Sequence, residues 1–186
     1  MSVTPSTMLP LGTVAPDFTL LDTVSGKQVS LQESKSAAAT VILFICNHCP
    51  YVVYINEKLA EIAKAYTAKG IQFIAISAND VANHPADAPD KMTQCAKDNG
   101  YVFPYLYDET QEVAKAYQAA CTPDFYVFDG DLKCIYRGQF DSARPGNDKP
   151  VTGTDLTHAL DLALQGAIVP EDQQCPSQGC NIKWKD

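Results

Sequence analysis

Positive charge is scarce in this sequence of 186 residues. Its 14 lysines and arginines stand against 22 aspartates and glutamates, which gives a formal net charge of −8. Binding of such an acidic chain to a polyphosphate would add charge repulsion and release no counterions. Nucleic acid is therefore not expected among its partners.

Long apolar runs are also missing. The longest strongly apolar stretch covers residues 41–46, whereas a helix that crosses a bilayer needs about 20 such residues. Residues 1–12 have neither the basic start nor the apolar core of a secretory signal. We therefore expect no membrane partner and a cytoplasmic location.

Internal repeats, low-complexity tracts and long linkers are absent as well. With 46% hydrophobic and 19% charged residues, the composition is that of an ordinary globular protein with enough material for a core. We therefore expect residues 1–186 to form a single domain.

Cysteine, in contrast, is plentiful for a cytoplasmic protein, and an odd number of cysteines argues against a fully paired disulfide scaffold. In a reducing compartment, closely spaced cysteines indicate redox chemistry or a metal site more often than structural crosslinks. The pairs Cys46/Cys49 and Cys175/Cys180 are this close. The seven cysteines are Cys46, Cys49, Cys95, Cys121, Cys134, Cys175 and Cys180.

The hydrophobic pattern of the first half predicts a strand, a helix and a second strand. Residues 40–45 and 71–77 are nearly uninterrupted apolar runs, as in strands that are buried on both faces. Between them, apolar residues recur at helical spacing, and Gly70 ends the helix. This order implies a right-handed parallel crossover. The inward-facing helix residues are Val52, Ile55, Leu59, Ile62, Ala63 and Tyr66.

Turn residues predict two hairpins. Residues 18–21 and 28–31 flank a Ser–Gly turn, and residues 125–128 and 134–136 flank an Asp–Gly–Asp turn. The second hairpin makes its two strands antiparallel. It follows that the sheet should be parallel early in the chain and antiparallel late.

Three further helices are expected. One begins near Pro89 and ends at Gly100. Another follows Asp108, with Gln111 in the reciprocal position of a capping box. The last is amphipathic and ends before Gly166. Together these elements predict an α/β fold with a central mixed sheet that is flanked by helices on both faces.

Cys46 and Cys49 lie where the first buried strand turns into its helix. A helix N-terminus carries unpaired N–H groups and a partial positive charge, which favour a thiolate. With two residues between them, both sulfurs share one helical turn and can form a disulfide. We expect Cys46 to stand at the cap with a lowered pKa and to attack first, while Cys49 resolves the mixed disulfide.

His48 lies between the two cysteines. A partly cationic imidazole would stabilise the thiolate further and make the pair more oxidising. The alternative is an exposed histidine on the first turn with little electrostatic effect.

A metal site is a second interpretation of this motif. Two cysteines and a histidine are good ligands for zinc or copper, and Cys175 and Cys180 could complete the set. Structural zinc sites, however, place both cysteine pairs on short knuckles, whereas Cys46 and Cys49 stand between a strand and a helix. The redox interpretation is therefore preferred, without a metal or other cofactor.

Thr122 and Pro123 directly precede the predicted strand 125–128. Proline is tolerated at the start of a strand. A cis bond at this position would expose the neighbouring backbone to a substrate peptide beside the sulfurs. Few X–Pro bonds are cis, but the order of the elements favours a cis bond here.

In these features the chain resembles the thioredoxin superfamily, in particular the redoxin branch related to alkyl hydroperoxide reductases and TlpA-type thiol reductases. Besides the Cys46–Cys49 motif and Thr122–Pro123, the resemblance rests on residues 15–18 (Ala–Pro–Asp–Phe) and 136–138 (Tyr–Arg–Gly). It covers about residues 12–166.

The resemblance implies a thioredoxin-like fold with an N-terminal hairpin extension, an insertion at about 80–107 before the cis-proline strand, and a C-terminal tail at about 167–186. It implies that Cys46 is the nucleophile and Cys49 the resolving thiol, and that Pro123, with Thr122 and Asn47, binds the substrate. The partners it implies are protein or small-molecule disulfides and an electron-donating thiol system.

Peroxiredoxins are the serious alternative within this resemblance. Their motif places a threonine three residues before a peroxidatic cysteine that is often followed by proline. Cys49 and Pro50 fit the end of that pattern, but Cys46 replaces the threonine. An antioxidant role with peroxide as substrate would also need an arginine near the thiolate, for which Arg137 and Arg144 are the candidates.

The remaining cysteines are expected outside the chemistry. Cys95 and Cys134 fit inward positions of a helix and a strand. Cys121 should lie near the site and be buried, although a third redox thiol is an alternative. In the tail, a local disulfide loop of Cys175 and Cys180 is allowed. We expect both to be peripheral to catalysis, with the tail packed onto the domain through Ile182 and Trp184.

Overall fold

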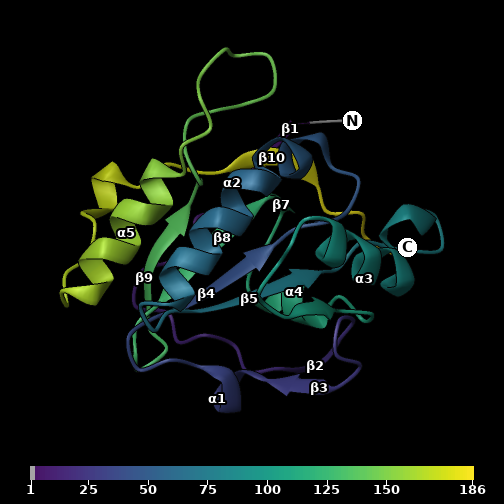
Figure 1. Cartoon of the computed structure of the whole chain (residues 1–186), viewed down its shortest axis with the longest axis horizontal. Helices are drawn as coiled ribbons and strands as arrows, with labels where there is room; N and C mark the ends of the chain where they lie inside the picture. The colour runs from purple at the N-terminus through teal and green to yellow at the C-terminus, as the bar shows by residue number, and fades with distance from the viewer. Residues whose placement is uncertain (1–2) are drawn as a thin grey trace.

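The computed structural model describes residues 3–186, and its centre is a seven-stranded mixed sheet in the order β3-β2-β6-β5-β4-β8-β9 (Figure 1). The strands of this sheet are β2 (Thr19–Asp22), β3 (Gln28–Ser30), β4 (Thr40–Phe44), β5 (Gln72–Ser77), β6 (Tyr105–Tyr107), β8 (Asp124–Phe128) and β9 (Cys134–Gly138). The helices are α1 (Leu31–Ser34), α2 (Pro50–Thr67), α3 (Pro89–Asp98), α4 (Glu112–Ala116) and α5 (Thr154–Leu164), with short 3-10 turns at Pro85–Asp87 and Glu171–Gln173.

The β4–α2–β5 unit is the predicted parallel crossover. All five residues of β4 are buried, and β4 pairs with β5 in parallel, with Val41 opposite Phe73. The inward face of α2 packs on this pair through the predicted residues. The helix is followed by Gly70 at φ +92°, a conformation that favours glycine. The strand, the helix and its stop are thus confirmed.

Two apolar clusters fill the two faces of the sheet. Residues of α2, α3 and α5 cover the face to which Val41 and Leu43 point. Residues of α1 and α4 cover the other face, to which Ile42 and Phe44 point. The alternation along β4 follows from the opposite directions of successive side chains in a strand. The sheet is thus covered by helices on both faces, as predicted.

Both predicted hairpins are present, β2 with β3 and β8 with β9, each antiparallel. The segment before the cis-proline strand contributes α3 and also β6, which pairs in parallel with β5 and antiparallel with β2. We did not predict β6. The three residues that form it carry too little pattern to distinguish them from a loop.

The predicted capping box before α4 is wrong. The helix begins at Glu112, and its cap is Gln111 at φ +66°. Asp108 does accept a hydrogen bond from the Ala114 backbone N–H at 2.8 Å, but Gln111 donates to the carbonyls of Ala78 and Lys183 instead of reaching back. A contact with the distant C-terminal tail has therefore replaced the local one.

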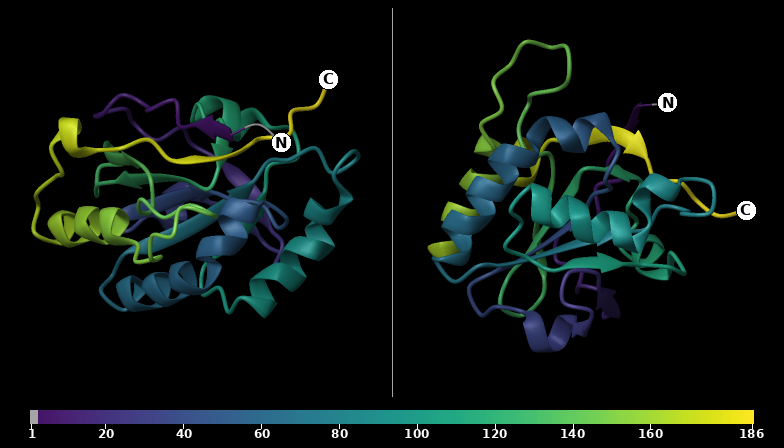
Figure 2. Two further views of the ribbon diagram at one scale, coloured as in Figure 1. Left: turned by 90° about the horizontal axis from the view of Figure 1, so that it is seen from above. Right: turned by 45° about the vertical axis from the view of Figure 1, so that its right-hand side comes forward.

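A second, three-stranded sheet has the order β1-β10-β7. It joins the N-terminal strand β1 (Val3–Pro5) and the tail strand β10 (Gln178–Asn181) to β7 (Cys121–Thr122), which directly precedes Pro123. Figure 2 shows the yellow tail running beside the purple N-terminal segment. The tail is thus an integral part of the fold around Pro123.

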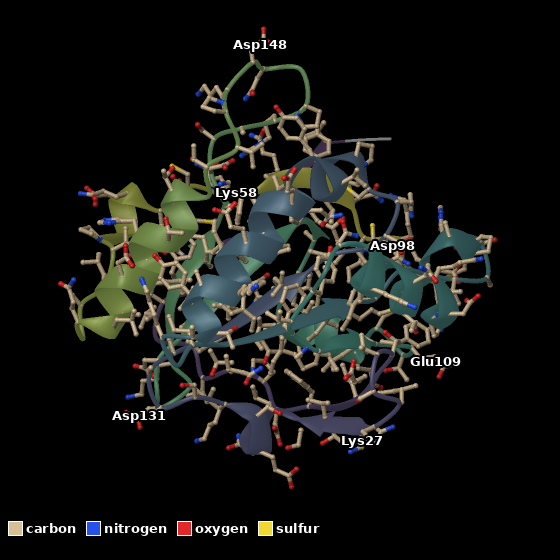
Figure 3. All side chains as sticks on the ribbon, viewed as in Figure 1. Lys27, Lys58, Asp98, Glu109, Asp131 and Asp148 are labelled. Carbon is tan, nitrogen blue, oxygen red and sulfur yellow. The ribbon has the colours of Figure 1, made fainter. Side chains whose placement is uncertain are left out.

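Between β9 and α5 a loop projects from the domain, with Asp148 at its tip (Figure 3). Among residues 3–186, no helix combines the length and hydropathy that a membrane span requires.

Candidate active site

Cys46 and Cys49 lie in the turn that joins β4 to α2. The backbone N–H of Ile45 still bonds to β5, and α2 begins at Pro50 with Cys49 as its N-cap. Cys46 is 2% exposed and Cys49 is fully buried. The prediction that Cys46 occupies the cap is therefore wrong, because the helix begins one residue after the second cysteine.

Thr122 and Pro123 meet this turn from the other side of the site. The peptide bond between them is cis, as predicted. The Cys46 Sγ lies 3.7 Å from the Thr122 Oγ1, and the Cys49 Sγ lies 3.3 Å from the Thr122 carbonyl oxygen. The fold thus brings the cysteine motif and the Thr–Pro motif together from positions more than 70 residues apart.

The two thiols influence each other, and their pKa values move in opposite directions. The Cys46 S–H lowers the pKa of Cys49 to about 5, supported by Cys180 and Thr122, although burial opposes the shift. The pKa of Cys46 is raised well above its usual range by the same contact, by burial and by the Asp87 carboxylate. We predicted a lowered pKa for Cys46, whereas these shifts favour the thiolate at Cys49.

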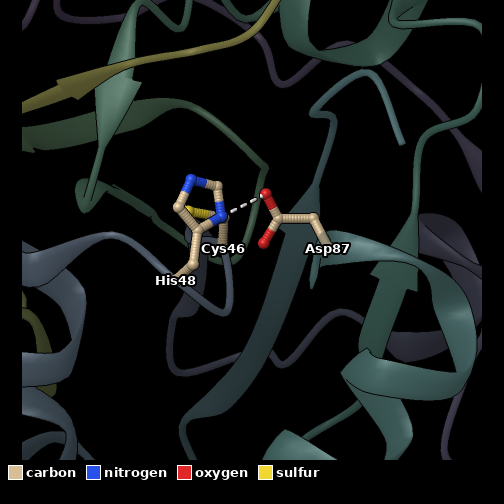
Figure 4. A group of neighbouring side chains, drawn as sticks. All are labelled: Cys46, His48 and Asp87. Atoms are coloured by element: carbon tan, nitrogen blue, oxygen red, sulfur yellow. Dashed lines mark ion pairs between the residues drawn. The ribbon is translucent and has the colours of Figure 1, made fainter. Parts of the chain in front are cut away.

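His48 faces Asp87, whose side chain is fully buried (Figure 4). The Nδ1 of His48 lies 2.7 Å from the Asp87 Oδ2, and its ring stacks on His84 at a centroid distance of 5.9 Å. The imidazole is thus placed beside the sulfurs, but its nearest charged partner is this carboxylate. Its role in tuning the thiolate stays a prediction.

Asp87 is a site residue that the sequence analysis missed. Its carboxylate accepts hydrogen bonds from the Asn47 backbone N–H and the Asn79 side chain, both at 2.9 Å. Asn47 in turn donates to the Ala86 carbonyl and accepts from the Tyr105 hydroxyl. The loop around Asp87 is therefore built into the wall of the site. A buried aspartate in a polar loop has no local pattern that would reveal it.

The ligand atoms of Cys46, His48 and Asp87 lie within 4.8 Å of one another. The group differs from the metal set that we considered, in which Cys49 joined Cys46 and His48. In the structure the sulfur of Cys49 contacts Cys180 and the Thr122 carbonyl and is not part of this group. A cation at this position would therefore be held by one sulfur, one nitrogen and one carboxylate.

Neither candidate arginine contacts the sulfurs through its described hydrogen bonds. Arg137 is buried and binds the Leu9 carbonyl, Gln174 and Glu171, so that it ties the tail to the domain. Arg144 binds backbone carbonyls of its own loop and Gln139. It also lines a narrow cleft beside Pro123. The cleft is lined by Tyr51, Ile55, Pro123, Phe140, Asp141, Ala143, Arg144, Ser177 and Gln178.

The tail brings a third sulfur into the site. The Sγ atoms of Cys180 and Cys49 are only 2.7 Å apart, and Cys180 is 3% exposed. Burial raises the pKa of Cys180 to about 12, helped by the neighbouring Cys49. Cys175, in contrast, is exposed. The prediction that both tail cysteines are peripheral is thus wrong for Cys180, because strand pairing far from the motif carries it to Cys49.

Cys121 and Cys134 are buried as expected, whereas Cys95 is only half-buried. Cys121 is buried near Pro123 with its pKa raised by burial. Cys134 is buried, and burial raises its pKa to about 12. Cys95 on α3 is half-buried. Of the two residues expected to fix the tail, Ile182 is 1% exposed, whereas Trp184 remains 40% exposed.

The fold and the cysteine pair beside a cis-proline define a protein of the thioredoxin superfamily, in its redoxin branch. The model of the AhpC/TSA family matches residues 11–137. This match spans more than half of the chain, which therefore belongs to the AhpC/TSA family.

Solved structures agree with this assignment. An uncharacterised conserved protein from Geobacillus kaustophilus is 56% identical, with a TM-score of 0.97, over 100% of this chain and 97% of that one. A hypothetical protein from Sinorhizobium meliloti is 47% identical, with a TM-score of 0.94, over 98% of both chains.

A more distant structure shares the fold. The thiol:disulfide interchange protein of the thioredoxin family from Chlorobium tepidum is 18% identical, with a TM-score of 0.63, over 82% of this chain and 97% of that one. The comparison with curated protein sequences gave no significant match. Family and fold together support a redox function.

Proposed function

We propose that the protein is a thiol–disulfide oxidoreductase that exchanges its Cys46–Cys49 pair with disulfides of proteins or small molecules. The observation that supports this most directly is that the sulfurs of Cys46 and Cys49, at a helix start, both contact Thr122 beside the cis Thr122–Pro123 bond. Reversible dithiol chemistry needs a thiolate and a partner thiol close by, and Cys46 and Cys49 supply both.

The exchange proceeds in two displacements. One enzyme thiolate attacks a sulfur of the substrate disulfide, and the substrate leaves one thiolate as the mixed disulfide forms. The second enzyme cysteine then displaces the other substrate thiol, so that Cys46–Cys49 is oxidised and the substrate has gained two electrons and two protons. A thiol donor returns the electrons. We propose that this occurs in the cytoplasm, where a reducing poise keeps the pair mostly as dithiols.

Reduction of insulin disulfides, with dithiothreitol as the electron source, tests this function. The wild-type protein should accelerate the reaction, Cys46→Ser and Cys49→Ser should not, and Cys175→Ser should match the wild type. No acceleration by the wild type would refute the proposal.

Trapping of mixed disulfides in two variants identifies the attacking sulfur. The resemblance assigns the attack to Cys46, and mixed disulfides would then accumulate in Cys49→Ser. The lowered pKa of Cys49 favours the other order, and trapping would then occur at Cys49 when Cys46 and Cys180 are both replaced by serine. Mass spectrometry of the trapped peptides distinguishes the two.

Peroxide reduction is a second candidate, favoured by the thiolate at Cys49 and by membership of the AhpC/TSA family. The Cys49 thiolate would attack the peroxide, whose O–O bond breaks to give a sulfenic acid and release water or an alcohol. A neighbouring thiol would then condense with the sulfenic acid to a disulfide and release a second water, and a thiol donor would reduce that disulfide. Consumption of hydrogen peroxide that survives in Cys46→Ser but not in Cys49→Ser would establish this antioxidant activity. Absence of consumption in the wild type would exclude it.

A further inference from the structure

Cys180 is the feature that the dithiol function does not use. It comes from the C-terminal tail, 131 positions beyond Cys49, yet the two Sγ atoms are 2.7 Å apart. That separation is only about 0.7 Å longer than a covalent S–S bond of about 2.05 Å. Both side chains are buried, so the contact lies inside the domain and not at its surface.

The position of Cys180 is fixed by backbone pairing. It lies in β10, the middle strand of the three-stranded sheet, opposite Thr122 of β7 on one side and Val3 of β1 on the other. Thr122 is the same residue that contacts both sulfurs of the motif. The register of β10 on β7 therefore sets which tail side chain reaches Cys49.

Gly179 permits this close approach. A Cβ at this position would collide with the carbonyl group of Thr122 and crowd the ring of Pro123. Only a residue without a side chain lets the strand lie so near to the cis-proline. The absence of a side chain at Gly179 therefore allows β10 to bring Cys180 close to Cys49.

The tail is also anchored on both sides of β10. Before it, the Ser177 backbone N–H donates to the Ser6 hydroxyl at 2.8 Å. After it, the Lys183 backbone N–H donates to the Asn79 side chain at 2.9 Å, and its carbonyl accepts from the Asp80 backbone at 2.8 Å. A sulfur that is held from both ends meets its partner without a search through loop conformations.

We propose that Cys180 is a third redox-active thiol of this site, and that Cys49 is the sulfur shared by two alternative disulfides, Cys46–Cys49 and Cys49–Cys180. The proposal rests on the proposed function, since it starts from the oxidised Cys46–Cys49 pair. It adds an exchange partner within the same chain.

The step is an exchange within the protein. The Cys180 thiolate attacks the Cys49 Sγ of the Cys46–Cys49 disulfide, and a Cys49–Cys180 bond forms as the Cys46–Cys49 bond breaks. The electron pair of the broken bond leaves on Cys46, which takes up a proton to replace the one that Cys180 lost. One disulfide and one thiol are present before and after, so no oxidant or reductant is consumed.

Pairing of β10 also has a consequence for substrates. While Cys180 lies opposite Thr122, the backbone edge of Thr122 is occupied by the tail. A peptide substrate that adds to the same edge must displace β10, as any added strand requires unpaired backbone groups. The tail thus competes with a substrate for Thr122 and for Cys49 together.

The first test uses the full chain with Cys46→Ser and Cys175→Ser combined. After oxidation with oxidised glutathione and blocking of the remaining thiols, trypsin leaves Cys49 in peptide 36–58 and Cys180 in peptide 138–183, because it does not cut before Pro145 and Pro150. We expect these peptides to be recovered as one linked species. Their recovery only as separate peptides, under conditions that oxidise the wild type, would overturn the proposal.

A second test keeps Cys46 and Cys49 in place, in case the first variant does not fold. Cys180→Ser removes one of two oxidised isomers, so its equilibrium constant for oxidation by glutathione should fall about twofold if the isomers have equal free energy. Cys175→Ser in the same tail should leave the constant unchanged. An unchanged constant in Cys180→Ser would overturn the proposal.

Failure of the two proposals can be told apart. If insulin reduction is intact but no Cys49–Cys180 link forms, the third thiol is refuted and the dithiol function stands. If the wild type does not reduce insulin, the proposed function is refuted, whether or not the Cys49–Cys180 link forms.

Discussion

The strand–helix junction and the C-terminal tail deliver sulfur to one site by different physical means. At the junction, Cys46 and Cys49 are positioned by the burial of β4 and α2 in the larger apolar cluster of the domain. In the tail, Cys180 is positioned by backbone pairing of short strands and by a few side-chain hydrogen bonds. The first arrangement depends on apolar packing, the second on hydrogen-bond geometry.

This difference indicates which region will respond to a perturbation. Apolar burial is non-directional and insensitive to pH, whereas hydrogen bonds depend on donor–acceptor geometry and on the protonation of any titratable partner. We therefore expect the junction to persist under conditions and substitutions that detach the tail. The two regions meet at the Cys49 sulfur, which contacts Cys180 of the tail.

Replacement of Cys49 by serine should have the largest effect, because both disulfides use its sulfur. Insulin reduction should fall to the rate of the uncatalysed reaction, and neither Cys46 nor Cys180 should retain an intramolecular partner at this position. Cys180→Ser should leave the Cys46–Cys49 disulfide able to form. Quantification of disulfide-linked peptides in both variants checks this asymmetry, and equal losses in the two would contradict it.

Much of the junction could be predicted from the sequence because its signals are local. The apolar run of β4, the helical spacing in α2 and the stop at Gly70 each lie within a few residues of what they determine. The cis bond at Thr122–Pro123 required more, namely the order of the elements along the chain. The predicted N-cap of α2, Cys46, was wrong, because the cap is Cys49. The assignment of the lower pKa to Cys46 was wrong as well.

The tail could not be predicted in this way. Strands β1, β7 and β10 have three, two and four residues, too few for an alternating pattern to be recognised. Asp87 joins the site from a polar loop, and Cys180, which lies 131 positions beyond Cys49, joins it through the pairing of β10 with β7. The distinction between Cys175, which is exposed, and Cys180, which is buried, depends wholly on that pairing.

The free energy of unfolding should depend on pH through Asp124, the residue after Pro123. Asp124 binds Ser6, which in turn binds Ser177 of the tail. Asp124 is fully buried and accepts hydrogen bonds from Ser6 and Tyr126. Burial raises its pKa to about 7, against about 3.9 in an unfolded chain. The folded state therefore holds this proton more tightly, and the resulting stability is complete below about pH 4 and lost as the pH rises through 7.

Over that window Asp124 should lower the free energy of unfolding by up to about 4 kcal/mol. Asp124→Asn cannot ionise, so its unfolding free energy should decline less between pH 5 and 8. Urea unfolding of both proteins measures the difference, in which contributions from other titrating groups cancel. Asp172→Asn, an exposed site in the tail, is the control. Parallel curves for wild type and Asp124→Asn would show that Asp124 does not titrate in this range.

Gly179→Ala should separate the two regions without removing any sulfur. The added methyl group collides with the Thr122 carbonyl, and overpacking of this kind costs about 1–3 kcal/mol. We expect β10 to shift away from β7, so that Cys49–Cys180 crosslinking slows while insulin reduction through Cys46–Cys49 is kept.

The control is Gln178→Ala, at an exposed position of the same strand, which should crosslink at the wild-type rate. Wild-type crosslinking in Gly179→Ala would mean that the strand tolerates the methyl group in place.

The smallest effect is expected from Asp87→Asn, which changes one charge at the junction and reaches the tail only through Asn79, whose side chain binds both Asp87 and the Lys183 backbone. The Asp87 carboxylate contributes to the raised pKa of Cys46, and an amide of the same size removes that repulsion while it can still accept from the Asn47 backbone. The pKa of Cys46 should therefore fall.

The pH dependence of iodoacetamide labelling at Cys46, resolved from Cys49 by peptide fragmentation, measures this fall in the pKa. Asp90→Asn, on the first turn of α3, should not alter it. An unaltered titration in Asp87→Asn would contradict a contribution of this carboxylate to the pKa of Cys46.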